Sequence, residues 1–477
     1  MSDLRTTALR GVIWSAVERF SVQGVQFVIQ LVMARLLLPS DYGLIGMLAI
    51  FMSLSQVFID GGFSNALIQK KDRTEADYTT VFYINLFISI LIYFILFLIA
   101  PWIADFYDQP LLSSITRVYS INLIINSLVA VNKVKLTVAL DFKTQSKISF
   151  VAAGLSGIVG IVCAYKGLAV WSLVIQILLN SLLNVLLSFY YVRWFPKLFF
   201  SKESFYSLFS FGSKLLIASI ISSVYSNIYN LVIGKKFDSS SLGFYTRANQ
   251  FVTFASINIS SILQRVSFPV LSEIQDDDMR LLNAYKKYIQ ISTWAIFPVI
   301  LGLCGVAEPL VRVLLTDKWI DCVPLIQILS FAYIWDCVIS VNLNLLYVKG
   351  RSDLVLKLEF KKKAIAFIIL FITLLFDLYV ICVGQVIYTI IALFLNTYYT
   401  KRLFNYGLTA QLKDILPQFI LSLFMLFISL LLVELIPNSM LSLVSSILLC
   451  IFFYLVGSYM LRLTPFLEIV KMVRCKL

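Results

Sequence analysis

Residues 34–47 read ARLLLPSDYGLIGM, and 200 positions later residues 234–247 read GKKFDSSSLGFYTR. This shift aligns Gly43 with Gly243 and Arg35 with Lys235. An internal repeat of this length in a chain of 477 residues predicts two structurally related halves. The composition of the chain then indicates what the two halves consist of.

The composition is that of a membrane protein. Hydrophobic residues make up 60% of the chain, charged residues only 14%, and the mean hydropathy is +0.89. A soluble domain has about 25% charged and about 45–50% apolar residues. Apolar runs of roughly 20 residues, enough to cross a bilayer as a helix, recur along the whole chain. The sequence therefore predicts an all-α polytopic membrane protein.

The apolar runs predict about 14 transmembrane helices. We expect a six-helix lobe over residues 1–200, a second six-helix lobe over 201–400, and two additional helices with a cytoplasmic tail over 401–477. A short polar break at Asp377 separates the eleventh helix from the twelfth. An even number of helices in each half gives both halves the same orientation in the membrane, so the predicted repeat is parallel.

The net charge of +13 follows the predicted topology. With both termini in the cytoplasm, 28 of the 39 Lys and Arg residues fall in inner segments and 7 in outer segments. Lys133 is among the inner residues, and Arg247 is among the outer ones. Such a bias is typical of multi-pass proteins, in which basic loops stay in the cytoplasm. We therefore interpret the basic charge as a topology signal and expect no nucleic-acid partner.

Several classes of chemistry lack the residues that they need. The chain has no histidine, and its seven cysteines are scattered without CxxC spacing, so we expect no metal site. P-loop, GxGxxG and GxSxG motifs are also missing from the sequence, and no cofactor is expected.

The apolar stretch near the N-terminus is interrupted by Glu18 and Arg19 and is interpreted as a retained first helix. The segment GLSGIVG at residues 154–160 is interpreted as a face for close helix packing.

Polar residues at helical spacing form one stripe on each of four predicted helices, over residues 12–34, 44–66, 208–233 and 247–269. The first two stripes are Ser15, Arg19, Gln23, Gln26 and Gln30, and Ser53, Gln56, Asp60 and Ser64. The other two are Ser219, Ser223, Ser226 and Asn230, and Thr253, Ser256, Ser260 and Gln264, with Arg265 beside them. A charged group in lipid at mid-bilayer costs about 2.5–3.5 kcal/mol on insertion scales. These faces should therefore line water or each other, and we expect a polar cavity between the two lobes.

The candidate substrate-binding residues come from these stripes, and each also has a simpler interpretation. The set is Arg19, Gln23, Gln26, Gln30, Arg265, Ser223, Ser226 and Asn230. A single Ser, Gln or Asn more often only bonds a neighbouring helix, and either arginine could instead be an interfacial anchor. Glu18, Asp60 and Asp336 are candidate cation or proton sites, although structural ion pairing is an equally good interpretation of each.

Three segments carry a resemblance to a known family: RLLLPSDYGLIGM, FIDGGFSNALIQKKDRTEADYTTVFYINL and LGFYTRANQF. They resemble the signature segments of bacterial polysaccharide transporters, the Wzx-type flippases of lipid-linked oligosaccharides. These belong to the multidrug/oligosaccharidyl-lipid/polysaccharide exporter superfamily. The resemblance extends from the first helix to about residue 400, and the last two helices match in hydropathy alone.

The resemblance implies a flippase without enzymatic activity in the bacterial inner membrane. Its substrate would be an undecaprenyl-diphosphate-linked oligosaccharide of O-antigen, capsule or exopolysaccharide, moved from the inner to the outer leaflet by alternating access. Besides this substrate and membrane lipid, a polysaccharide polymerase and other assembly proteins are the implied partners. Arg19 and Arg265 would suit the diphosphate because guanidinium groups bind phosphate through two parallel hydrogen bonds.

Two other classes of function stay open. A cation-coupled exporter of small molecules or drugs would share the fold, but its cavity would be more acidic and aromatic. A membrane glycosyltransferase or polymerase would need catalytic residues on large outer loops, whereas the longest predicted outer connections have only about 15–20 residues.

Overall fold

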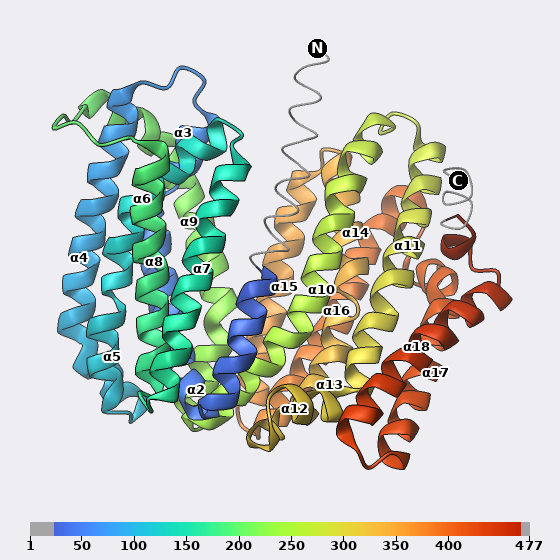
Figure 1. The fold of residues 1–477 in the computed structure, drawn as a ribbon. Helices are drawn as coiled ribbons and strands as arrows, with labels where there is room; N and C mark the ends of the chain where they lie inside the picture. Colours follow the sequence, from blue (N-terminus) through green and yellow to red (C-terminus); the bar gives the residue numbers. More distant parts are fainter. Residues whose placement is uncertain (1–22, 469–477) are drawn as a thin grey trace. The chain divides into compact units, whose positions relative to one another are not determined.

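The computed structural model describes residues 23–468 of the chain (Figure 1). Within this range the regular secondary structure is helical, with no strand. Eleven helical stretches of the described chain are long and apolar enough to cross a membrane. The protein is therefore an all-α polytopic membrane protein, as the composition predicts.

The chain divides into two compact units, Met1–Gly243 and Phe244–Leu477, and the boundary lies inside helix α10 (Ser239–Glu273). Before α10, the first unit contains a helix over residues 23–36 and then α2 (Pro39–Asp60), α3 (Phe63–Gln69), α4 (Glu75–Tyr107), α5 (Leu111–Tyr119), α6 (Ile121–Val138), α7 (Phe142–Tyr165), α8 (Val170–Val192) and α9 (Lys202–Lys236). After α10, the second contains α11 (Asp278–Gly305), α12 (Ala307–Leu314), the short η1 (Asp317–Trp319), α13 (Cys322–Tyr333), α14 (Asp336–Val348), α15 (Ser352–Thr373), α16 (Leu378–Phe404), α17 (Leu408–Leu435) and α18 (Ser439–Met460).

In α4, the face turned outward is apolar, and the face turned inward carries buried polar side chains among apolar ones. Phe87, Phe94 and Leu98 recur at helical spacing and are exposed, whereas Asn85 and Ser89 are fully buried. Ser89 Oγ lies 3.0 Å from Ser127 Oγ of α6 and donates a hydrogen bond to it. An apolar outer face suits a helix that meets lipid, and the buried polar side chains bond a neighbouring helix.

Side-chain caps explain where two of the long helices begin. At the start of α4, Asp77 N donates to Thr74 Oγ1 (3.3 Å), and Thr74 N donates to Asp77 Oδ2 (2.8 Å). Asp77 also forms a salt bridge of 2.8 Å with Lys70. At the start of α16, Val380 N donates to Asp377 Oδ1 (2.9 Å), which confirms the predicted break at Asp377.

The sequence predicts a single fourth helix over residues 112–131; in the structure this segment consists of α5 and α6, and α6 continues to Val138. Lys133 and Lys135 were expected in a cytoplasmic segment, but both lie within α6. The helix can extend because Lys135 has partners: its Nζ forms a salt bridge of 2.8 Å with Glu75. The same Nζ lies 4.6 Å from the ring centroids of both Tyr78 and Trp194.

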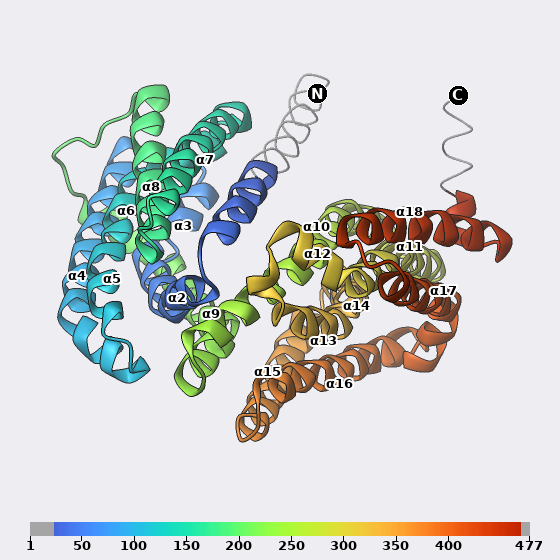
Figure 2. The same cartoon turned by 60° about the horizontal axis from the view of Figure 1, so that its bottom comes forward.

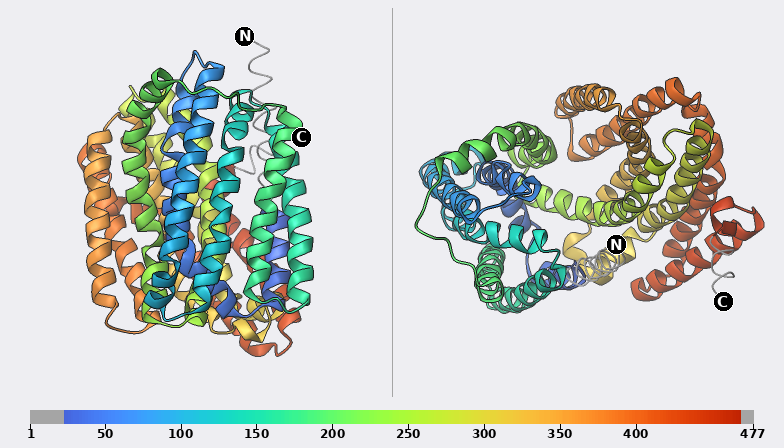
Figure 3. Two further views of the ribbon diagram at one scale, coloured as in Figure 1. Left: turned by 90° about the vertical axis from the view of Figure 1, so that its left-hand side faces the viewer. Right: turned by 90° about the horizontal axis from the view of Figure 1, so that it is seen from above.

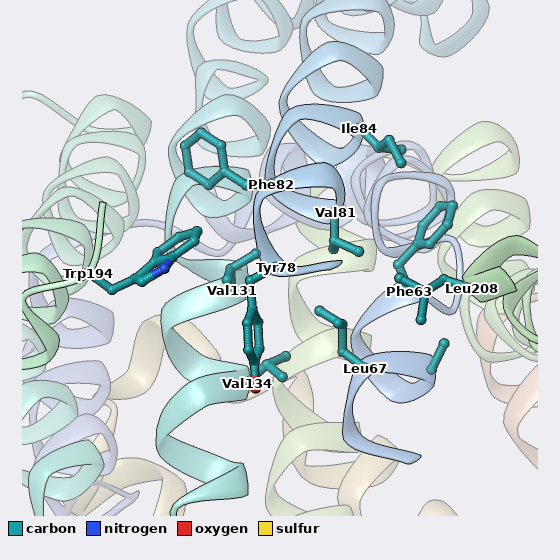
Figure 4. Close-up of a cluster of buried hydrophobic side chains, with 11 residues drawn as sticks. Phe63, Leu67, Tyr78, Val81, Phe82, Ile84, Val131, Val134, Trp194 and Leu208 are labelled. Atoms are coloured by element: carbon teal, nitrogen blue, oxygen red, sulfur yellow. The ribbon is translucent and has the colours of Figure 1, made fainter. Parts of the chain in front are cut away.

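Trp194 attaches the segment between α8 and α9 to α4. Its Nε1–H donates to Glu75 Oε2 (2.7 Å), and its ring packs edge-on against Tyr78 and Phe82 (Figure 4). Further along this segment, Ser201 N donates to Thr80 Oγ1 (3.1 Å). The cluster in Figure 4 therefore joins α3, α4 and α6 to the connection that leads into α9.

The two copies of the repeat meet through their glycines. A Cβ on Gly43 would lie 1.7 Å from the carbonyl oxygen of Ser239, and a Cβ on Gly243 would lie 1.9 Å from that of Pro39. Ser239 and Pro39 are the first residues of α10 and α2, and they are themselves 200 positions apart. Each glycine of the repeat therefore permits its helix to touch the backbone where the other helix starts.

Two of the three glycines in the predicted packing segment GLSGIVG make close contacts. A Cβ on Gly157 would lie 2.1 Å from Ile29 Cδ1, and one on Gly160 would lie 2.9 Å from Gln176 Cβ, which belongs to α8. Figure 3 shows α7 and α8 side by side, as these contacts require. A Cβ on Gly154 would meet nothing within 4 Å, so the packing prediction holds for Gly157 and Gly160 and is wrong for Gly154.

In the second unit, a buried hydrogen-bond network joins four helices. Asn342 of α14 and Gln411 of α17 exchange two amide hydrogen bonds, of 2.9 and 3.0 Å. Thr400 Oγ1 of α16 donates to Asn342 Oδ1 (2.6 Å), and Tyr285 of α11 lies 3.4 Å from Gln411 Nε2. This network fixes α17 in the unit, and Figure 2 shows α17 and α18 beside α11.

Arg247 was expected in an outer segment, but it is buried in α10. The reason is that α10 begins at Ser239, eight residues before the predicted start. Arg247 NH1 donates to Gln250 Oε1 (2.8 Å), and its guanidinium carbon lies 5.4 Å from the centroid of the Trp319 ring. This residue of the signature LGFYTRANQF therefore packs the start of α10 against η1.

Candidate functional site

The polar face of α2 meets that of α9 inside the first unit. Ser53 Oγ is hydrogen-bonded to Ser223 Oγ, and Asn227 Nδ2 donates to Ser53 Oγ (2.9 Å). Near the far end of α2, a Cβ on Gly62 would lie 2.5 Å from the carbonyl oxygen of Gly212, so the two backbones touch there. The structure thus brings together two of the predicted stripes, and Asn227 joins them although it was not predicted.

The other predicted residues of α9 do not take part in this contact. Ser226 is exposed, and its Oγ donates to the carbonyl oxygen of Ser222 (2.9 Å). Asn230 is half-buried one turn further along the helix. A role of Ser223, Ser226 or Asn230 in binding substrate stays a prediction.

The first helix carries its predicted glutamines at different depths. Gln26 is exposed, whereas Gln23 and Gln30 are half-buried. Within the described residues, Gln23 Oε1 is buried without a hydrogen-bond partner. Arg19 and Glu18 lie outside the described residues, as does the side chain of Arg265 in α10. These three charged positions therefore stay predictions.

Asp60, the last residue of α2, has a counter-charge that sequence analysis missed. Its carboxylate accepts from Ser64 Oγ of α3 (3.4 Å) and is attracted by the ammonium group of Lys133 in α6. Asp60 is half-buried, and Lys133 exposes its side chain. The only signal in the sequence was the spacing in VNKVKL, where Lys133 and Lys135 share a helix with the apolar run before them.

Lys133 and Lys135 lie two residues apart on α6 but have different surroundings. The Lys135 ammonium is enclosed by Glu75, Tyr78 and Trp194. Lys133 has the more distant Asp60 as its counter-charge and an exposed side chain. Lys133 is therefore a cation that an anionic ligand could bind without separating the close ion pair of Lys135 and Glu75.

Asp336 of the second unit also has a lysine as its counter-charge. The ammonium group of Lys362 in α15 attracts the half-buried Asp336 carboxylate at the start of α14. Lys362 is only 6% exposed and is ion-paired with Glu359 on its own helix. Two carboxylates thus share one buried lysine, an arrangement that fits the structural ion pairing considered for Asp336. Its role in ion coupling stays a prediction.

A model of one protein family matches residues 32–324, which include both copies of the repeat, Asp60, Lys133 and Arg247. The family is described as "Polysaccharide biosynthesis protein". This chain belongs to that family.

Curated relatives of this chain include proteins of several bacteria. The teichuronic acid biosynthesis protein TuaB of Bacillus subtilis is 25% identical over 356 residues, which cover 74% of each chain. The lipopolysaccharide biosynthesis protein WzxC of Escherichia coli is 26% identical over 361 residues, covering 74% of this chain and 73% of the relative. The succinoglycan biosynthesis transport protein ExoT of Rhizobium meliloti is 23% identical over 326 residues, covering 68% and 66%.

Solved structures show that this family member has a transporter fold. The lipid II flippase MurJ in an inward closed conformation superposes with a TM-score of 0.77 at 15% identity, covering 94% of this chain and 98% of MurJ. An inward-facing multidrug resistance MATE transporter of the MOP superfamily gives 0.61 at 14% identity, covering 82% and 98%. The chain therefore shares the fold of these two proteins.

Proposed function

We propose that this protein moves an undecaprenyl-diphosphate-linked oligosaccharide from the inner to the outer leaflet of the bacterial inner membrane by alternating access. Family membership over residues 32–324 supports lipid-linked oligosaccharide transport as the general activity. The observation that carries the finer proposal is Lys133, an exposed residue of a candidate membrane helix with Asp60 as its counter-charge. A cation kept in an apolar helix is costly unless it has a function or a partner.

The position of Lys133 suits the loading of a diphosphate at the inner leaflet. Lys133 lies on α6 about half a turn from Lys135, which is paired with the first residue of α4. In the topology proposed from the basic loops, with both termini in the cytoplasm, this end of α6 is the cytoplasmic end. The diphosphate would replace Asp60 as the counter-charge of Lys133. The lysine would therefore have an anionic partner both before and after the substrate binds. The lipid tail would stay in the bilayer while the sugars follow the polar faces.

The proposal is tested in cells that lack their own flippase for a known repeat unit. We expect Lys133→Gln to reduce the appearance of the repeat unit in the outer leaflet at least tenfold and to accumulate the lipid-linked intermediate. Lys133→Arg should restore most of the rate because it keeps the cation. Lys147→Gln, on the exposed face of α7, removes the same charge and is the matched control.

Wild-type transport by Lys133→Gln at normal membrane levels would overturn the loading site. The positions predicted from the sequence are tested in the same assay with Arg19→Ala and Arg265→Ala. If the wild-type protein itself moves no lipid-linked oligosaccharide, the proposed activity fails regardless of the variants.

Export of a small molecule is the alternative function, favoured by the similarity in fold to the MATE transporter. It is distinguished by cation-dependent efflux of ethidium from vesicles. Efflux that is abolished by Asp60→Asn, together with unchanged lipid intermediates in cells, would favour the exporter.

A further inference from the structure

A pocket at one end of the second unit lies apart from every residue considered above. It has a volume of about 240 Å³ and lies between α12 and the connection from α17 to α18. Its polar lining is Glu308, Arg312, Ser439 and Ser442, and two prolines, Pro309 and Pro437, are among its apolar walls. Pockets for drug-sized ligands measure about 300–1,000 Å³, so this one has room for a single ring and not for a chain.

The charges around the pocket do not favour an anion. Arg312 Nε donates to Glu308 Oε1 (3.1 Å), and Arg312 NH1 donates to Asp317 Oδ1 (2.7 Å). Two carboxylates therefore surround one guanidinium. A phosphate group would have to displace a carboxylate and would meet the repulsion of both, so the diphosphate of a lipid carrier does not fit here.

Ser442 has a hydroxyl group that forms no hydrogen bond with the described residues. It is 1% exposed and lines the pocket, yet within the described residues its Oγ has no hydrogen-bond partner. An unpaired buried hydroxyl costs about 1–3 kcal/mol, which a ligand hydroxyl could recover. The pocket lining thus includes a serine with an unpaired hydroxyl group, the Glu308 carboxylate, whose Oε1 accepts from Arg312, and two prolines.

The pocket lies at the end of the unit that is poor in basic residues. At the opposite end, Lys287 pairs with Glu468, Lys349 pairs with Asp278, and Lys401 and Arg402 form the last turn of α16. Because basic segments stay in the cytoplasm, the pocket end faces the outer side of the membrane in the proposed topology.

We propose that this pocket binds one neutral pyranose ring of the oligosaccharide on the outer side, after translocation. Hydroxyl groups of the sugar would bond Glu308 and Ser442, and its C–H face would pack on Pro309 and Pro437. The choice of a sugar as ligand rests on the proposed function. The chemistry of the lining, which is polar, without free positive charge and partly apolar, is independent of it.

The test uses the full-length protein in detergent, with methyl glycosides of glucose, galactose and N-acetylglucosamine as probes at millimolar concentration. Saturation-transfer NMR should show binding of at least one glycoside. We expect Ser442→Val and Ser439→Trp to reduce the signal at least fivefold. The matched control is Ser446→Val, one turn further along α18, because Ser446 is also buried and unpaired among the described residues but does not line the pocket.

Equal signals from Ser442→Val and Ser446→Val, or no signal from the wild-type protein, would overturn the sugar site. So would competition by inorganic phosphate, because the site would then be one for anions. Lys133→Gln should bind the glycosides as the wild type does, so a failure of the loading site and a failure of this pocket give different results.

To identify the source of the sugar, a photocrosslinking amino acid is placed at position 439 in cells that make the polysaccharide. An adduct that contains the lipid carrier is the expected product. An adduct with lipid-free polymer alone would overturn the assignment to the translocated substrate.

Discussion

The two units hold their helices together in different ways. In the first unit, helices meet backbone to backbone, at Gly43 with Ser239 and at Gly62 with Gly212. In the second unit, the amides of Asn342 and Gln411 bond each other and reach two further helices. Unpaired buried amide atoms occur in both units, but both amide atoms of Asn85 and of Asn132 lack a partner among the described residues, whereas Asn344 and Asn396 of the second unit each have one such atom.

This difference indicates in which unit buried amide groups stabilise the fold through hydrogen bonds. In the second unit they complete a network, so removing one member leaves the others unsatisfied. In the first unit the two glycine contacts need no polar side chain, and the amides of Asn85 and Asn132 belong to no such network among the described residues. Three stability measurements test this difference between the units.

The largest effect is expected for Gly43→Ala. Its new methyl group would overlap a backbone oxygen at 1.7 Å, which cannot move aside as a flexible side chain would. We expect a loss of about 3 kcal/mol or more in stability, at the upper end of the cost of overpacking, measured as thermal unfolding in detergent. Gly243→Ala should behave alike, and Gly154→Ala, which meets nothing within 4 Å, is the control. A wild-type melting temperature for Gly43→Ala would show that the backbone contact does not hold the unit together.

A smaller loss is expected for Asn342→Leu in the second unit. It leaves both amide atoms of Gln411 without their main partner and removes the acceptor of Thr400. One buried unsatisfied group costs about 1–3 kcal/mol, so the melting temperature should fall clearly. The variant Asn342→Leu/Gln411→Leu should recover part of the loss, because both sides of the amide pair are then apolar. Equal destabilisation by the single and the double variant would argue against a network.

The smallest effect is expected for Asn85→Leu in the first unit. Because both polar atoms of this side chain lack a partner among the described residues, an apolar side chain of similar volume should be neutral or slightly stabilising. The measurement is the same unfolding curve. A loss as large as that of Asn342→Leu would remove the contrast between the two units.

The sequence predicted the fold well because membrane insertion constrains it at every helix. Hydropathy alone indicated the helices, and the spacing of Gly43 and Gly243 indicated the repeat that their contacts with Ser239 and Pro39 explain. Charged residues at helix ends were harder to place. Lys133, Lys135 and Arg247 resembled loop residues because their partners, Asp60, Glu75 and Trp319, lie far away in the chain.

The candidate site was predicted only in part, for the same physical reason. Helical periodicity places Ser53 and Ser223 on polar faces, and the structure shows these two faces in contact. Periodicity cannot reveal which helices are neighbours, so it gave no indication that α6 contributes Lys133 opposite Asp60. The outer pocket could not be predicted either, because it depends on how α12 packs beside α18.

The reciprocal glycine contact has the symmetry of a dimer. Gly43 touches the residue that corresponds to Pro39 in the other repeat, and Gly243 touches Pro39 itself. Such a contact is isologous, as in a two-fold oligomer of identical subunits. Each glycine therefore has a counterpart 200 positions away, where the same kind of backbone contact sets the same limit on side-chain size.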